Sequence, residues 1–136
     1  MEQHERQELL ILIGNFIEMG HVENIAAMFR QDPDLYALTG DLLRDERFVV
    51  RLGMAVLFEE LAATRPAKIH LAIPFLLPLL QDRTASIRGE AATLLGIIAS
   101  PAALTAITPL FNDSDPQVAE IVADILAEQD RQNTTP

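Results

Sequence analysis

Apolar residues recur at helical spacing through most of the chain. Between residues 50 and 61 they stand at Val50, Met54, Leu57, Phe58 and Leu61, in steps of four, three, one and three. Because an α-helix turns once in about 3.6 residues, this spacing places all five on one stripe of a helix. The pattern therefore predicts an amphipathic helix that turns one face towards a core.

The same arrangement occurs three times. Windows at residues 42–61, 79–98 and 110–129 align without a gap, and each holds the end of one helix, a short acidic turn and a second amphipathic helix. Such internal repetition predicts a stack of helix pairs in which each pair covers the apolar face of its neighbour. The shared columns are an aspartate in the turn (Asp45, Asp82 and Asp113), an apolar residue in the second helix (Val50, Ile87 and Val118), and a following residue that is Arg51, Arg88 and then Ala119.

Prolines mark the expected boundaries of the repeats. Asp32-Pro33, Arg65-Pro66 and Ser100-Pro101 each follow a predicted helix, and proline suits the first position of the next one. We therefore expect a single domain over residues 1–130. Its parts are an irregular helix pair at 1–31 that is broken at Gly20, repeats at 33–64, 66–99 and 101–130, and a frayed tail at 131–136.

This pattern resembles HEAT repeats, including the helical repeats of phycobilisome-lyase type. The motifs that carry the resemblance are PLLQD at 78–82 with Ile87-Arg88, PLFND at 109–113 with Asp115-Pro116 and Val118, and LLRD at 42–45 with Val50-Arg51. The resemblance implies an all-α fold, an α-α superhelix in the form of a short HEAT-like solenoid of about four helix pairs. The VRLG run at 50–53 is also similar to helical modules fused to glutaredoxin- or thioredoxin-like domains.

The resemblance also implies a role for the aspartate and arginine columns. In HEAT-like proteins the matching residues form a ladder that ties turns and neighbouring repeats together. Ala119 stands where a third arginine would be, as expected of a cap on the stack. We therefore expect a structural rather than a catalytic role for Asp45, Arg51, Asp82, Arg88 and Asp113.

Composition and charge narrow the class of protein. The 136 residues are 49% apolar, which is enough for a packed core, and no cysteine is present for a disulfide or a thiolate metal site. The net charge is −10, and the acidic residues dominate beyond Arg88, so nucleic acid is not an expected partner. The uncharged run at 91–111 is long enough to span a membrane, but Ser100-Pro101 interrupts it. We expect a cytoplasmic chain that does not insert into a membrane.

Nothing in the sequence points to catalysis. His4, His21 and His70 form no pair at helical spacing, so neither a metal nor another cofactor is expected. Adjacent Glu59 and Glu60 point in different directions on a helix, which is a poor geometry for acid–base work. The glycines are isolated and form no phosphate-binding loop.

Two surfaces are candidates for binding. The segment IHLAIPFLLPLL at 69–80 is apolar on almost every side, so it is either core or an interface, most simply that of a homodimer, and Phe75 and Leu76 are its candidate contacts. The second helices of HEAT pairs usually face the partner. Their polar positions give the other candidates: Glu59, Glu60, Glu90, Thr93, Glu120, Asp124 and Glu128.

The main functional hypothesis is a non-catalytic protein-binding or assembly scaffold with a protein partner. One alternative is an accessory module of a thioredoxin- or glutaredoxin-like redox system. Another is a bilin-lyase-related HEAT protein, although Tyr36 is the single tyrosine and no aromatic cluster is evident.

Overall fold

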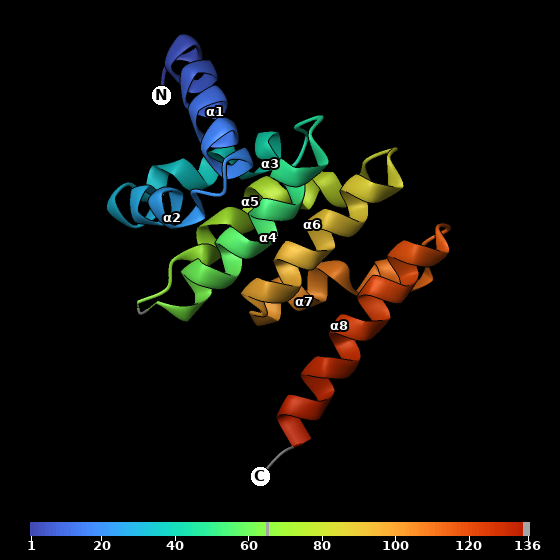
Figure 1. Cartoon of the computed structure of the whole chain (residues 1–136). Coiled ribbons are helices and arrows are strands. Elements are labelled where there is room, and N and C mark those ends of the chain that lie inside the picture. Colours follow the sequence, from blue (N-terminus) through green and yellow to red (C-terminus); the bar gives the residue numbers. More distant parts are fainter. Residues whose placement is uncertain (65, 135–136) are drawn as a thin grey trace.

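The computed structural model describes residues 1–64 and 66–134, and within these every regular element is helical. The all-α prediction is therefore confirmed. Four α-helices are long and lie nearest the viewer in Figure 1, and shorter elements lie between them in the chain. The elements are α1 (Gln3–Glu18), α2 (Val22–Gln31), η1 (Pro33–Leu38), α3 (Thr39–Leu42), α4 (Phe48–Ala63), η2 (Ile69–Ala72), α5 (Ile73–Leu76), η3 (Leu77–Gln81), α6 (Ala85–Ile98), α7 (Pro101–Ile107), η4 (Thr108–Asn112) and α8 (Pro116–Thr134).

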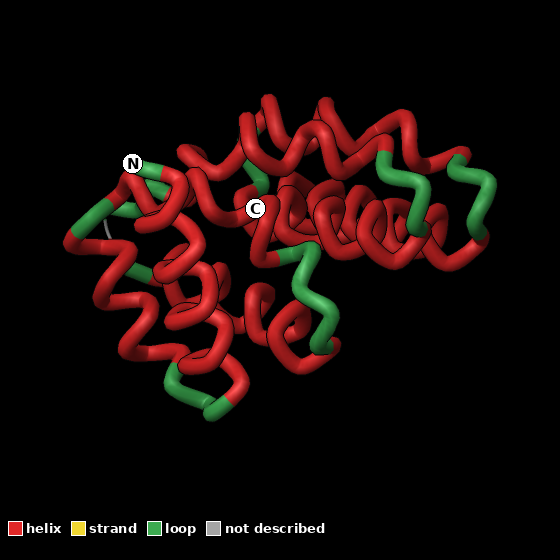
Figure 2. The backbone as a smooth tube through the Cα atoms, turned by 90° about the horizontal axis from the view of Figure 1, so that it is seen from above, coloured by secondary structure: helices red, strands yellow, loops and turns green. Residues whose placement is uncertain are grey.

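The helices form two layers. The second helices of the three repeats, α4, α6 and α8, lie side by side, with α4 packed on α6 and α6 packed on α8 (Figure 1). The interrupted first helices lie behind them, and short loops join the layers (Figure 2). The α1–α2 pair packs against α4 and turns at Gly20, whose φ is +87°, as the sequence predicts.

Prolines interrupt the first helices of the second and third repeats. Pro74 and Pro78 fall where η2, α5 and η3 follow one another, and Pro109 falls where α7 gives way to η4. Proline has no backbone N–H and clashes with the carbonyl four residues earlier, so the chain tightens into short 3-10 turns. The layer of second helices contains no such interruption and is built from continuous helices.

The structure corrects two predicted boundaries. Pro66 does not open a helix, because residues 66–68 form a loop and η2 begins at Ile69. The predicted frayed tail at 131–136 is wrong for its first part, since α8 continues to Thr134. Arg65 and residues 135–136 lie outside the described residues. Ser100 caps α7, with its side-chain oxygen accepting a hydrogen bond from the N–H of Ala103 at 3.2 Å.

The predicted helical stripe lies in the core. The side chains of α4 that define it are fully buried or nearly so, as the periodicity requires: Val50, Met54, Leu57, Phe58 and Leu61. Beside them the rings of Phe29 and Tyr36 meet edge to face with centroids 5.1 Å apart, and Tyr36 meets Phe58 in the same way at 6.2 Å. Burial raises the pKa of the Tyr36 hydroxyl above its ordinary value.

The apolar segment at 69–80 divides between core and surface. Ile69, Ala72, Leu76, Leu79 and Leu80 are buried, whereas Leu71, Phe75 and Leu77 are about two-fifths exposed. One side of the segment therefore packs as core under α6, and the other side is exposed; the interface, including that of a homodimer, stays a prediction.

Two glycines allow helices to approach closely. A Cβ added at Gly40 in α3 would lie 2.8 Å from the backbone carbonyl oxygen of Phe75 in α5. At Gly96 in α6 the space is filled by Ile125 of α8, whose atoms lie 2.9–3.1 Å from the position of such a Cβ. These contacts set the spacing within the first layer and between α6 and α8.

Replacing Gly40 with alanine is expected to destabilise the fold by about 1–3 kcal/mol, because a backbone carbonyl cannot move aside as a side chain can. Urea unfolding followed by circular dichroism measures this change. The matched control is Gln7→Ala on the exposed side of α1, which should change stability by less than about 0.5 kcal/mol. Equal stability of the two variants would contradict the close approach.

Candidate binding surface

The acidic turns of the three repeats share one geometry. The carboxylate of the turn aspartate accepts a hydrogen bond from the backbone N–H two residues later, at 2.9 Å in every case (Asp45, Asp82 and Asp113). Such a bond fixes the turn locally, since it replaces a backbone turn contact with a side-chain one. The aspartate column found in the sequence is thus a column of identical turns.

The arginines of the second column also hold the first two turns, through hydrogen bonds to backbone carbonyls. Nη1 of Arg51 donates to the backbone carbonyls of Asp45 at 2.8 Å and Glu46 at 3.1 Å. Arg88 repeats this on the next turn, where the carbonyls are those of Asp82 at 2.8 Å and Arg83 at 3.3 Å. The predicted pairs, Asp45 with Arg51 and Asp82 with Arg88, do meet, but through backbone oxygens rather than carboxylates.

Charged bonds then run from one repeat to the next. Arg88 makes a two-pronged contact with the carboxylate of Asp113, at 2.9 and 2.8 Å, in a site where the two side chains are only 14% and 6% exposed. Arg44 reaches Asp82 at 2.6 Å, and Arg51 reaches Glu90 at 3.1 Å. A bidentate contact of this kind fixes both the distance and the relative orientation of the two side chains, so it sets the register of neighbouring repeats.

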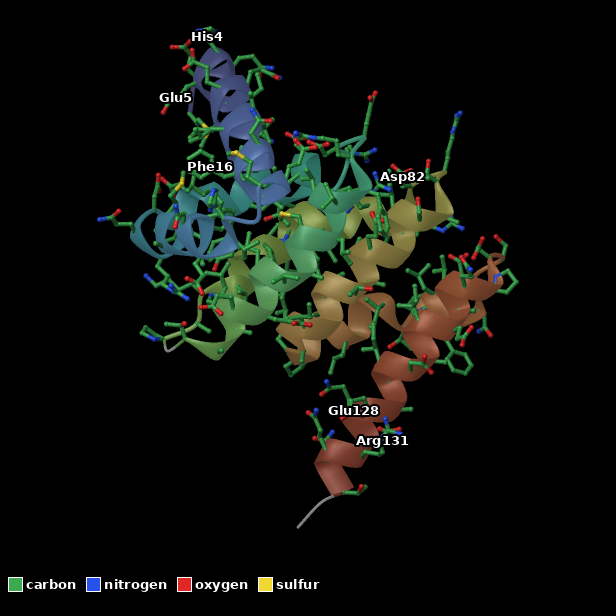
Figure 3. All side chains as sticks on the ribbon, in the orientation of Figure 1. His4, Glu5, Phe16, Asp82, Glu128 and Arg131 are labelled. Carbon is green, nitrogen blue, oxygen red and sulfur yellow. The ribbon has the colours of Figure 1, made fainter. Side chains whose placement is uncertain are left out.

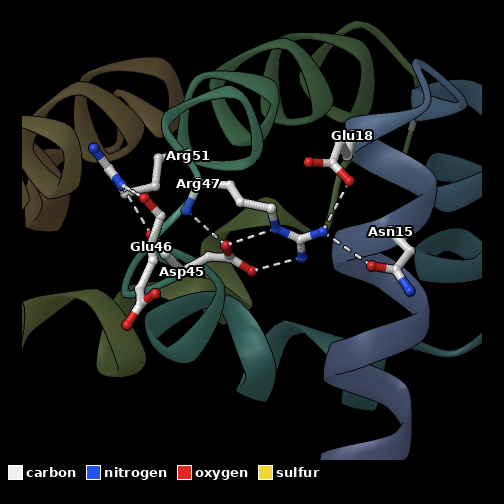
Figure 4. A network of polar contacts seen from close by, with 6 residues as sticks. All are labelled: Asn15, Glu18, Asp45, Glu46, Arg47 and Arg51. Carbon is white, nitrogen blue, oxygen red and sulfur yellow. Dashed lines mark hydrogen bonds and ion pairs between the residues drawn. The ribbon is translucent and has the colours of Figure 1, made fainter.

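Arg47 connects the first helix pair to the repeats, a role that the sequence did not reveal. Its guanidinium bonds to the Asp45 carboxylate at 2.9 and 3.0 Å and also to Asn15 and Glu18 of α1 (Figure 4). This guanidinium holds the pKa of Asp45 below its usual range. The sequence carried no signal for it, because α1 lies about thirty residues away along the chain.

The other turn carboxylates are also stabilised in their charged form. The Arg88 guanidinium lowers the pKa of Asp113, and the hydrogen bond from the backbone N–H of Thr84 is the main cause of the lowered pKa of Asp82. On α8, Arg131 likewise lowers the pKa of Glu128, and Figure 3 shows this pair together, well away from Asp82.

An apolar stripe is exposed on the layer of second helices. Phe48, Leu52 and Val56 lie one helical turn apart on α4 and are 63%, 55% and 50% exposed. We call these three residues the α4 stripe. The Arg51 guanidinium lies over the Phe48 ring, 5.6 Å from its centroid, and so fixes one end of the stripe. The sequence did not reveal the stripe, since residues 48–58 are apolar on several sides and their periodicity indicates only the buried side.

Two grooves adjoin the stripe and connect it to α8. The first runs between α4 and α6, and Phe48, Leu52, Glu90 and Thr93 are among its lining residues. The second runs between α6 and α8, with Thr93, Asp124 and Glu128 in its lining. Because Thr93 lines both grooves, they form one continuous surface across the three helices.

The structure brings together some of the predicted binding residues and separates others. Glu90, Thr93, Asp124 and Glu128 line the two grooves, with Glu90 held by Arg51. The predicted role of Leu76 is wrong, because its side chain is fully buried. The remaining candidates are exposed but lie outside the two grooves: Glu59, Glu60, Glu120 and, in the other layer, Phe75. Glu60 also lies 3.5 Å from Arg30 of α2.

Comparison with known families agrees with this repeated geometry. The model of the family described as HEAT repeats matches residues 36–127, which is most of the chain. The chain belongs to the HEAT-repeat family. No curated protein and no solved structure matches it. HEAT repeats generally serve as scaffolds for protein interaction and are typically non-catalytic.

Over residues 1–64 and 66–134, no group of three or more histidine and acidic side chains is placed to hold a metal ion. Within the same part of the chain, no helix combines the length and the apolar character needed to cross a membrane.

The HEAT-repeat ladder predicts a pH-dependent stability. A carboxyl whose pKa is lowered in the folded state stabilises the fold above its unfolded pKa of about 3.9, and this stabilisation is lost as the pH falls towards the folded pKa. We expect Arg88→Met to unfold at lower urea concentration than the wild type at about pH 7. The gap should narrow at about pH 3, because Asp113 is then largely protonated in the unfolded chain and part of the stabilisation by Arg88 is lost. A gap that stays constant over this range would contradict the pairing.

Proposed function

We propose that this HEAT-repeat chain is a non-catalytic protein-binding scaffold and that its partner docks on the α4 stripe and the adjoining grooves. The observation that carries the proposal is the exposure of three large apolar side chains in line, on a layer of continuous helices. Single exposed apolar residues are ordinary, but a contiguous row beside a groove is typical of a protein interface.

The chemistry of the surface supports the proposal. The α4 stripe offers apolar area, Phe48 is held by Arg51, and Arg51 is itself held by Glu90. A pre-ordered surface loses little side-chain entropy on binding, so more of its contact energy contributes to affinity. Phe29, Tyr36 and Phe58 do form an aromatic cluster, which the sequence did not reveal, but their side chains are buried in the core and so do not favour the bilin-lyase alternative. Neither this alternative nor the redox-accessory one is part of the proposal.

A double variant tests the docking surface. Phe48→Gln with Leu52→Gln removes two apolar contacts from exposed positions, so the fold should be retained while partner binding weakens by about 2 kcal/mol or more. The measurement is affinity capture from the native cell with quantitative mass spectrometry. A specific partner should be enriched by the wild type and reduced at least about tenfold by the variant.

The matched control is Leu77→Gln with Phe111→Gln, which changes exposed apolar residues of the other layer. This control should capture the partner as the wild type does, and both variants should show wild-type helicity. Undiminished capture by the α4 variant would refute the proposed site.

A further inference from the structure

The three second helices differ in what they offer a partner. α4 contributes the apolar stripe, with its flanking Arg51 neutralised by Glu90 at 3.1 Å. α8 contributes four acidic residues and one arginine, Arg131, which pairs with Glu128, so the helix keeps a net charge of −3. α6 lies between them. The surface is therefore apolar along one edge and acidic along the opposite edge.

The spacing of these edges suits a helix. Packed helices lie about 8–10 Å apart, so α4 and α8, each packed on α6, have axes about 16–20 Å apart. A single helix with its side chains is about 10–12 Å across. One laid over α6 therefore contacts the α4 stripe with one side and the Asp124–Glu128 side of α8 with the other.

Other occupants fit the surface less well. An extended peptide could not bind by strand addition, because all regular elements of the described residues are helical and no strand edge is open there. A second copy of the chain brings another net charge of −10 to an acidic surface. Electrostatic complementarity instead favours a cationic partner, and the whole-chain charge steers such a partner towards the protein.

We propose that the occupant is a basic amphipathic helix of a partner protein, with its apolar face on Phe48, Leu52 and Val56 and its lysine or arginine face towards Asp124 and Glu128. This inference rests on the proposed function, and it adds the chemical class of the partner. It predicts that affinity depends on both apolar contact and salt concentration.

The experiment uses the full chain and a fluorescent helical peptide of about 18 residues, with leucine on one face and lysine on the other. Fluorescence anisotropy measures binding. We expect the Phe48→Gln, Leu52→Gln variant to bind at least about tenfold more weakly than the wild type. Asp124→Asn with Glu128→Gln should bind about threefold or more weakly and should lose part of the salt dependence between about 0.05 and 0.5 M salt.

Two matched controls distinguish an effect of the proposed surface from an effect of the overall charge. Glu5→Gln with Glu23→Gln removes the same number of charges from exposed positions on α1 and α2, and it should bind like the wild type. A peptide with glutamate in place of lysine should bind at least about tenfold more weakly than the lysine peptide. Equal loss in both charge variants, or equal binding of the two peptides, would overturn the proposal.

The outcomes separate the partner class from the proposed function. If the α4 variant loses its captured native partner but the lysine peptide does not bind the wild type, the docking surface stands and the basic-helix inference falls. If light scattering shows a wild-type dimer that the α4 variant converts to a monomer, the occupant is a second copy, and the inference also falls.

Discussion

The first two turns of this stack are each held by an arginine that bonds both to its own turn and to the next repeat. The guanidinium of Arg88 donates to the carbonyls of its own turn and grips the carboxylate of the next repeat, while that carboxylate also accepts the N–H of its own turn. Apolar burial drives the helices together, but it does not choose between neighbouring registers. The directional hydrogen bonds select the register, because a shift of one residue would break several of them at once.

The two layers of helices differ in continuity and in what they expose. In the first layer, proline interrupts the first helices of the second and third repeats, and Gly40 brings α3 close to α5. The second layer is continuous and carries the exposed apolar row. A surface on continuous helices keeps its side chains in fixed relative positions, which suits recognition of another helix.

The sequence predicted the repeats well and the binding surface only in part. Burial of Val50, Met54 and Leu57 follows from helical spacing alone, and the identical turns follow from the aspartate column. The exposure of Phe48 and Leu52 depends on whether another element covers that side of α4, and no local pattern records this. The error at Pro66 has a related cause, since proline permits a helix start without imposing one, and η2 begins where Ile69 reaches the core.

The fit of Ile125 against Gly96 gives α6 a further influence over recognition. This contact sets how near α8 lies to α6, and therefore how wide the trough is between the apolar and acidic edges. In the proposed docking mode, a larger residue at Gly96 would displace the Ile125 side chain or α8 and so change the width of this trough, although it touches no partner itself. Under the proposed function, a buried residue would therefore affect which helix diameters the surface accepts, independently of the residues that make contact.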